Sequence, residues 1–290
     1  MRVDLYTVCW NEADFLPFFF RHYDPWVDRY VVYDDGSTDG SAEMLAQHPR
    51  VELRRFHRSQ AESFVMSHTA LQDSVWKESR GEADWVVVTA IDEFLHMKAG
   101  LNKDLLATCT RAGVTAIPAL GYEMISASLP DASCNLIETV TVGAYHQKMC
   151  KLSLFDPVAV HETRFAPGRH GARPEGRIAI PQVDELMLCH YRYLGFERTL
   201  LRNLALNERL GEIDRKKGWG KEYAWHRDRL VEQWQRVEAA SLDLAAPSFD
   251  VRRDSPLATR WWRRPDDAGQ PRPWPRIPVR AGPSAVPQGS

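Results

Sequence analysis

Segments rich in apolar residues recur through the first hundred residues and alternate with segments of helical period. The predicted strands are Arg2–Cys9, Tyr30–Tyr33, Val51–Phe56 and Trp85–Thr89, and the predicted helices are Glu12–Tyr23, Ser41–Gln47 and Ala61–Ser79. Strands that lack a polar face are buried on both sides, which is typical of a parallel sheet covered by helices. The alternation therefore predicts an α/β fold built on a mostly parallel sheet flanked by helices.

Polar residues follow three of these strands directly. Asn11 and Glu12 come after the first strand, residues 34–40 (DDGSTDG) after the second, and Asp92 and Glu93 after the fourth. The carboxyl ends of parallel strands meet at one edge of a sheet, and ligands of such sheets bind beyond that edge. We therefore expect these clusters to share one site.

The DDGSTDG segment supports two interpretations. Gly36 permits a tight turn, and Asp39 or Ser41 can cap the next helix, which is a purely structural role. Capping does not need Asp34, which the buried strand delivers to the sheet edge. A carboxylate there can accept hydrogen bonds from a base edge or a ribose hydroxyl. This stretch alone favours the structural role and ligand binding equally.

Composition narrows the class of protein. With 290 residues, 44% of them hydrophobic and 26% charged, the chain has ordinary globular composition. Its apolar stretches are far shorter than a bilayer span, and the N-terminus MRVDLYTV lacks the apolar core of a signal peptide, so no export is expected. A net charge of -2 argues against nucleic acid as a partner. Five cysteines without CxxC spacing indicate neither a zinc site nor disulfides, which predicts a cytoplasmic location.

Residues 247–290 differ from the rest of the chain. They hold half of the 18 prolines, and eight arginines against four aspartates, with almost no periodic apolar pattern. The sequence therefore predicts a folded domain over 1–246 and a disordered, flexible Pro/Arg-rich tail over 247–290. The cluster at 261–264 (WWRR) offers a contact for an anionic membrane surface, which would place the protein at the periphery of the inner membrane. Solvated disorder is the simpler interpretation.

Three stretches together resemble a known family. Asn11-Glu12 with Leu16, then VVYDDGSTDGS at 31–41, then ADWVVVTAIDEFLH at 83–96 look like the nucleotide-sugar-binding half of family 2 glycosyltransferases, in the branch that carries a DxDEF element. The resemblance covers residues 3–97 and implies the GT-A fold, which is Rossmann-like. Weaker similarity continues in KMCKLSLFDP at 148–157, PGRH at 167–170 and LCHYRYLGFERTLLRN at 188–203.

The resemblance implies roles for individual residues. Asp34, with Asp35 beside it, matches the aspartate that contacts the nucleoside, usually uridine, and Asn11 and Glu12 would line the floor of the same pocket. Asp92 matches the aspartate that binds a divalent metal on the donor diphosphate. Mg²⁺ or Mn²⁺ suits that role, because hard cations take oxygen ligands and neutralise a diphosphate as it leaves. The domain would divide into a nucleotide-sugar-binding half, 1–97, and an acceptor half with C-terminal helices, 98–246.

Ala90 departs from the family pattern, which has a further aspartate two residues before Asp92. Three interpretations follow: Asp92 with a histidine suffices for the metal, Glu93 contributes to it, or the enzyme is weak or inactive. Glu93 has the alternative role of supporting the site from behind or of starting a helix.

The second half is expected to supply further site residues. GT-A enzymes often place a histidine on the metal or the diphosphate, and the candidates are His190, after the apolar stretch 186–189, and His170, in a Gly/Pro/Arg loop. Lys151 and Arg192 are candidates for balancing the charge of the diphosphate. Each of the four also has a plainer interpretation, as a structural histidine, an exposed loop residue or an ordinary surface cation.

An inverting transferase also needs a general base near the acceptor hydroxyl, normally Asp or Glu. Glu123 is favoured, because it follows the apolar stretch 114–120 and is expected near a strand end, and Glu162 comes next. Further candidates are Glu175, Asp184 and Glu185. A retaining mechanism would need no such base.

Two later segments, Phe196–Leu210 and Tyr223–Ala240, have helical spacing and are interpreted as packing helices with solvated charges, including Arg202 and Arg209. The GWGKEY segment between them, at 218–223, has aromatic and glycine content suited to stacking on a sugar.

Two classes of function follow. The first is a metal-dependent glycosyltransferase that moves a sugar from a nucleotide-diphosphate donor, a UDP-sugar by resemblance, to a glycan or lipid-linked acceptor in polysaccharide biosynthesis. The second is a non-catalytic nucleotide-sugar-binding or scaffold protein. A nucleotidyltransferase shares the architecture but would need a glycine-rich phosphate loop after the first strand, where VCWNEADF has no glycine.

Overall fold

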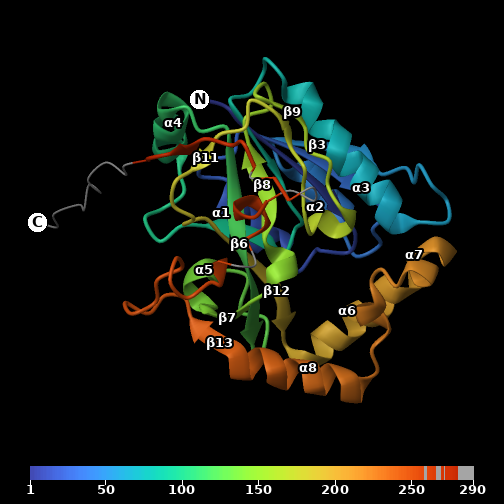
Figure 1. The fold of residues 1–290 in the computed structure, drawn as a ribbon. Helices are drawn as coiled ribbons and strands as arrows, with labels where there is room; N and C mark the ends of the chain where they lie inside the picture. Colours follow the sequence, from blue (N-terminus) through green and yellow to red (C-terminus); the bar gives the residue numbers. More distant parts are fainter. Residues whose placement is uncertain (258–259, 266–268, 271, 280–290) are drawn as a thin grey trace, which may run out of the picture.

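Ten strands form one sheet at the centre of the computed structural model, which describes residues 1–257, 260–265, 269–270 and 272–279 (Figure 1). Along the sheet the order is β13-β7-β6-β8-β4-β1-β2-β3, and β12 joins it beside β6 with β5 on its other side. Helices flank this sheet, so the α/β fold predicted from the sequence is confirmed.

The first half of the chain forms the parallel part of the sheet. β3, β2, β1 and β4 pair in parallel, with Cys9 opposite Asp34 and Leu5 opposite Val87. The bounds follow the predicted segments closely: β1 Val3–Cys9, α1 Leu16–Tyr23, β2 Arg29–Asp34, α2 Ser41–Gln47, β3 Val51–Arg55, α3 Phe64–Ser74 and β4 Trp85–Val88. Because these four strands run the same way, the polar residues that follow them meet at one edge, as in a Rossmann-like sheet.

The second half adds strands of both directions. β8 (Lys151–Phe155) runs antiparallel to both neighbours, β4 and β6 (Ala116–Ser126), whereas β12 (Met187–Leu194) runs parallel to β6. The sequence predicted that Glu123 lies near the end of a strand. It lies instead within β6, which continues to Ser126. The other elements of this half are β5 Glu93–His96, α4 Lys103–Ala112, α5 Leu136–Thr139, β7 Val142–Tyr145 and β13 Ser241–Asp243.

Three helices that follow β12 lie together at the lower right of Figure 1: α6 Phe196–Glu208, α7 Glu212–Lys217 and α8 Arg227–Ala240. α7 is held against the start of α3, because the Asp214 carboxylate accepts from Ser63 Oγ at 2.5 Å and from the Phe64 amide at 2.8 Å. A Cβ atom at Gly211 would lie 2.0 Å from the Glu62 carbonyl oxygen, so this close approach requires glycine. Shorter elements are β9 Val160–Glu162, β10 Glu175–Gly176, β11 Ile180–Pro181, β14 Arg276–Ile277 and the 3-10 turns Val75–Ser79, Gln147–Met149, Pro167–Arg169, Lys221–Ala224 and Trp261–Arg263.

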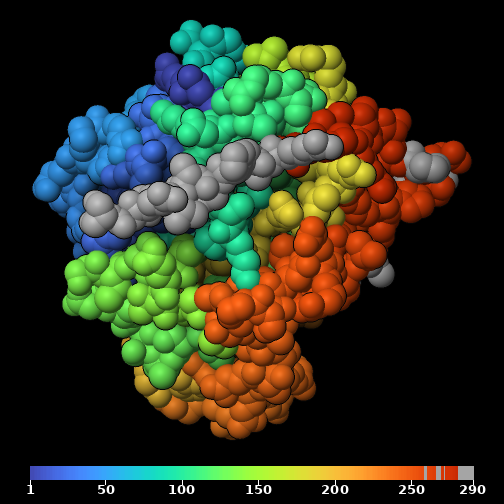
Figure 2. Space-filling model, turned by 90° about the vertical axis from the view of Figure 1, so that its left-hand side faces the viewer, coloured from blue at the N-terminus to red at the C-terminus, as the bar shows by residue number. Residues whose placement is uncertain are grey.

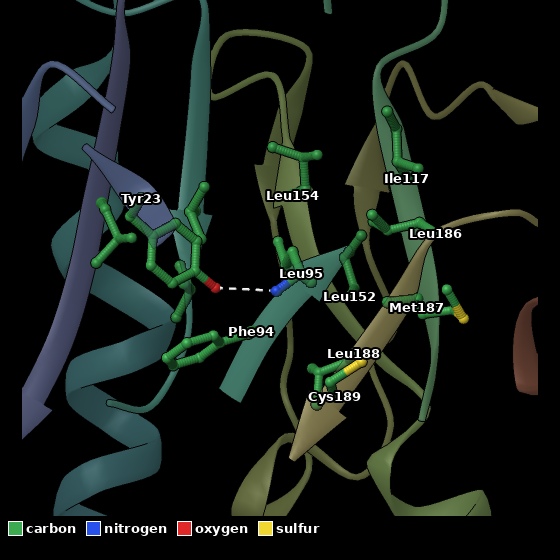
Figure 3. Packing of buried hydrophobic residues seen from close by; sticks show 14 of the residues in the cluster. Tyr23, Phe94, Leu95, Ile117, Leu152, Leu154, Leu186, Met187, Leu188 and Cys189 are labelled. Carbon is green, nitrogen blue, oxygen red and sulfur yellow. Dashed lines mark hydrogen bonds between the residues drawn. The ribbon is translucent and has the colours of Figure 1, made fainter. Parts of the chain in front are cut away.

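The DEF segment is anchored to α1 in the core. The Tyr23 hydroxyl donates to the Glu93 carbonyl oxygen at 2.8 Å and accepts from the Leu95 amide at 3.1 Å, the bond drawn in Figure 3. Phe94 stacks on His22 with ring centroids 4.8 Å apart, and β12 pairs with the other edge of β5. Contacts on both sides of β5 therefore fix the positions of Asp92 and Glu93 at its start.

Acidification should destabilise the protein through His22. Burial lowers the pKa of its imidazole to about 4, although a hydrogen bond with the Leu95 carbonyl oxygen opposes the shift. The unfolded chain takes up the proton near the usual value of 6.5, so the free energy of unfolding falls as the pH drops from about 6.5 to about 4. A His22→Gln variant should lose less stability than the wild type over this range in urea unfolding at each pH. Equal losses would contradict this role of His22.

The C-terminal segment packs against the body, so the flexible tail predicted over 247–290 is wrong for the residues that the structure describes. Phe249, Val251 and Trp262 are buried, and β14 pairs with β11. Figure 2 shows the orange and red residues of this segment lying against the yellow and green parts of the chain. The prediction relied on the absence of a periodic apolar pattern, but a few large side chains with specific partners hold this segment in place. Residues 258–259, 266–268, 271 and 280–290 of the predicted tail lie outside the described residues.

One buried carboxylate holds this segment in place. Asp184 accepts hydrogen bonds from Trp262 Nε1 and Arg260 Nη1, both at 2.9 Å, and from Arg263 Nη2 at 2.6 Å. Because the Trp262 ring is buried and Arg263 is bound to Asp184, these side chains of the predicted membrane-contact cluster face the body of the protein.

The five cysteines have free thiols, which agrees with the prediction of no disulfide framework. Within the described part of the chain, no helix combines the length and apolar character needed to cross a bilayer.

Candidate functional site

A cavity of about 320 Å³ opens at the carboxyl ends of β1 and β4. The first half of the chain contributes Trp10, Glu12 and the turn 90–93, and the second half contributes side chains from β6, β8, β12 and α6. Seven predicted site residues line this cavity: Glu12, Asp92, Glu123, Lys151, His170, His190 and Arg192. The fold thus brings charged residues that are widely separated in the sequence into one place.

Asn11 and Asp34 lie outside the cavity lining, and their side chains stabilise the adjacent turns. Asn11 has a φ of 52°, a left-handed conformation that asparagine tolerates, and its Oδ1 accepts from the Thr38 amide at 2.8 Å. The Asp34 carboxylate accepts from the Gly36 and Ser37 amides at 3.0 and 3.1 Å. Of the two interpretations of the DDGSTDG segment, these bonds support the structural one.

Asp35 is paired with a cation at the end of α6. Its carboxylate binds Arg209, whose guanidinium lies 4.0 Å from the centre of the Trp10 ring. Arg58 approaches the same carboxylate at 3.8 Å. A nucleoside that contacted Asp35 would have to share it with these two arginines.

Glu162, predicted as a general base, lies on β9 outside the cavity. Its side chain is 42% exposed and pairs with Lys77 at 2.6 Å. Of the other candidates, Glu175 forms a surface ion pair and Asp184 is buried under the C-terminal segment. Glu123 is the one of these predicted bases that lines the cavity.

Acidic and basic side chains alternate across the cavity. The Arg202 guanidinium donates to Glu12 and, at 3.1 Å, to Asp92 Oδ2. His190 Nε2 lies 3.3 Å from the same Asp92 oxygen, and His190 Nδ1 lies 2.8 Å from Glu123 Oε2. Three carboxylates are thus linked in a row through one arginine and one histidine.

This row of charges sets the protonation states at neutral pH. Burial opposes the charged form of His190, but Glu123 and Asp92 raise its pKa to about 10. Burial also opposes ionisation of Asp92, yet His190 and Arg202 hold the pKa of that carboxyl well below its usual range. For Glu12, burial outweighs Arg202 and raises the pKa to about 7. His190 is therefore a cation, Asp92 an anion, and Glu12 is poised between its two forms.

Glu93 belongs to a second, deeper cluster. Its carboxylate pairs with Lys151 at 2.5 Å and with Arg169, and all three side chains are buried. Arg169 also donates to the Val88 carbonyl oxygen at 2.6 Å, and Glu93 Oε2 accepts from the Ala90 amide at 3.3 Å. Glu93 therefore supports the site from behind, which was the structural alternative for this residue.

The residues predicted to bind a metal are engaged otherwise. His190 is held between two carboxylates, with Nε2 3.3 Å from Asp92 and Nδ1 2.8 Å from Glu123, so both ring nitrogens already have partners. His170 Nδ1 forms a hydrogen bond with the Lys148 carbonyl oxygen at 2.7 Å. Among the residues that the structure describes, no group of three or more His, Cys, Asp or Glu side chains is arranged to hold a metal ion. In this arrangement Asp92 and His190, each bound to oppositely charged partners, do not fit the predicted divalent metal.

Arg192 carries a positive charge that no carboxylate of the described residues pairs with directly. Its guanidinium lies 5.6 and 5.5 Å from the ring centres of Tyr193 and Tyr223 and donates to Asn203 Oδ1 at 3.3 Å. Tyr223 belongs to the GWGKEY segment at 218–223, all of which lines the cavity. A cation and an aromatic surface thus stand together at the cavity wall.

The sequence predicted that Arg202 and Arg209 lie on a solvated face of their helix, and the structure shows that this is wrong. Both bind carboxylates at the strand ends: Arg202 binds Glu12 and Asp92, and Arg209 binds Asp35. The two arginines are seven residues apart, about two helical turns, so they share one side of α6. The sequence analysis missed this role, and the seven-residue spacing of the two arginines is the one local signal for it.

Comparisons with known proteins do not assign the chain to a family. No family model matches it, and no curated protein matches it. Among solved structures, 4-diphosphocytidyl-2C-methyl-D-erythritol synthase is similar over 55% of this chain and 77% of its own, with 10% identity and a TM-score of 0.30. A TM-score this low supports no inference about function.

Proposed function

We propose that this protein is a glycosyltransferase that moves a sugar from a nucleotide-diphosphate donor, a UDP-sugar by the resemblance of residues 3–97, to a glycan or lipid-linked acceptor. The observation that carries the proposal is an electropositive cavity at the carboxyl-end edge of an α/β sheet. Six Lys and Arg residues line it against five Asp and Glu residues, and protonated His190 adds a positive charge. This balance favours an anionic ligand such as a nucleoside diphosphate.

The cavity wall offers both groups that such a donor needs. Arg192 has unused N–H donors for phosphate oxygens, because the hydrogen bond to Asn203 occupies one of its five. Trp10, Trp219 and Tyr223 provide flat surfaces on which a base or a sugar ring can stack. Lys151 is paired with Glu93, so it serves the site mainly by holding the buried cluster together.

Two carboxylates that line the cavity, Glu12 and Glu123, are the candidates for accepting the proton of an acceptor hydroxyl. Glu123, the base favoured from the sequence, stays ionised, because His190 outweighs burial and lowers its pKa. Glu12, whose pKa is raised to about 7 by burial, is the stronger base. Loss of transfer in Glu12→Gln or in Glu123→Gln, with donor binding retained, would identify the base.

Replacement of Arg192 by methionine should weaken the binding of UDP at least tenfold, or about 1.4 kcal/mol, because a charge-assisted hydrogen bond to phosphate is lost. Calorimetry measures the affinity, and release of UDP from a panel of UDP-sugars measures hydrolysis and transfer. Arg229→Met is the matched control, because Arg229 is exposed on α8 and pairs with Glu232. If Arg192→Met binds UDP as tightly as the wild type does, Arg192 does not bind the donor.

The alternative is a protein that binds a nucleotide sugar without transferring it. It is favoured by Ala90, whose methyl group contributes no ligand to the cavity, and by the ion pairs that engage Asp92 and Glu12. The same panel separates the two functions: the alternative shows UDP-sugar binding with no release of UDP from any donor and acceptor pair.

A further inference from the structure

We infer that Arg202 supplies, as a fixed part of the chain, the positive charge that a divalent metal would otherwise bring to the diphosphate, so that nucleoside diphosphates bind here without metal. The inference rests on the proposed function, since it concerns the donor of that reaction. The sequence alone had placed Arg202 on a solvated helix face.

The position of Arg202 is set by two carboxylates. Its guanidinium donates to Glu12 from one nitrogen and to Asp92 Oδ2 from another, and those two side chains are 9% and 8% exposed. Glu12 comes from the end of β1, Asp92 from the turn before β5, and Arg202 from the middle of α6. The guanidinium therefore lies between the strand ends at the edge of the sheet where a diphosphate would bind.

The carboxylates of Glu12, Asp92, Glu123 and Glu93 already have cationic partners. Asp92 Oδ2 has Arg202 on one side and His190 at 3.3 Å on the other. Glu123 is paired with His190, and Glu93 with Lys151 and Arg169. A metal ion that entered the row would have to displace an arginine and also meet the repulsion of the neighbouring cations.

Arg202 retains donors for a ligand. A guanidinium has five N–H groups, of which the described residues use two, and the residue lines the cavity. Its two carboxylate partners hold the plane of the guanidinium, so little side-chain freedom is lost when phosphate binds. Arginine matches phosphate oxygens in a bidentate geometry that a point charge lacks.

In the transfer, the bond between sugar C1 and the phosphate oxygen breaks with its electron pair on that oxygen. The acceptor oxygen forms the new bond to C1, and a cavity carboxylate takes the acceptor proton. Arg202 would stabilise the negative charge that develops on the departing nucleoside diphosphate, as fixed cations do for phosphate groups in other active sites.

The test measures binding of UDP, GDP, CDP and ADP by calorimetry, in EDTA and again with Mn²⁺. We expect at least one of them to bind with affinities that agree within about twofold in the two conditions. Arg202→Met should weaken that binding at least tenfold in both, and Arg202→Lys, which keeps the charge but not the bidentate geometry, should fall between. Arg198→Met is the control, one turn earlier on α6, where Arg198 pairs with the exposed Asp14.

The outcomes separate the two proposals. Binding that requires Mn²⁺ overturns the inference and leaves the proposed function standing. No binding of any nucleoside diphosphate in either condition overturns the proposed function, and the inference with it. If Arg202→Met melts well below the wild type, its affinity no longer tests the inference, and Arg202→Lys is used instead. A nucleoside diphosphate affinity of Arg202→Lys equal to that of the wild type would contradict the bidentate role of Arg202.

Discussion

A chain that ends at Ala246 should melt far below the full-length protein or fail to fold. The truncation removes Phe249, Val251 and Trp262, and burial of each large apolar side chain contributes about 1.5–3 kcal/mol. It also strips the cationic partners from the buried Asp184 carboxylate, a change that costs about 3–5 kcal/mol. Together these losses are comparable to the whole stability of a typical domain, about 5–15 kcal/mol. Scanning calorimetry of the two chains measures the difference.

Single substitutions show whether the effect belongs to specific contacts. Trp262→Ala should lower the free energy of unfolding by about 3–5 kcal/mol, because the ring is buried and its Nε1 is bound to Asp184. Leu257→Ala, in the same segment, removes a side chain that is 68% exposed and should change stability by less than about 0.5 kcal/mol. A truncated chain that melts at the full-length temperature would mean that this segment adds nothing to the fold.

Replacement of Glu93 by glutamine should lower the free energy of unfolding by about 3–5 kcal/mol, although the side chains have nearly the same shape. The loss arises because Lys151 and Arg169 remain buried without their counterion. Urea unfolding measures it. Combining Glu93→Gln with Lys151→Met should restore part of the stability, because one of the two unpaired cations is then gone.

Glu162→Gln is the matched control for this prediction. Glu162 pairs with Lys77 at 2.6 Å, nearly the distance of the Glu93–Lys151 pair, but both partners are partly exposed. Exposed pairs contribute about 0–1 kcal/mol, so this variant should unfold almost as the wild type does. Equal losses for Glu93→Gln and Glu162→Gln would show that burial does not set the strength of these pairs.

The sequence alone was enough to predict the first half of the fold. The strand-like segments of four to eight residues and the helical period between them depend on local composition, so β1 to β4 and the helices between them follow the predicted segments. The parallel direction of these strands also follows, because helices connect them. With it came the expectation that Glu12 and Asp92 meet at one edge.

Only the tertiary structure decided which partners the charged residues take. Arg202 and Asp92 are 110 residues apart and Arg260 and Asp184 are 76 apart, and no periodic pattern links the members of either pair. Whether an arginine lies in water or between two carboxylates depends on how helices and loops pack across the sheet, and packing energy comes from all the contacting elements together. For this reason the sequence alone placed Glu12 and Asp92 at one edge of the sheet. The guanidinium between them and the packing of the C-terminal segment were decided by the tertiary structure.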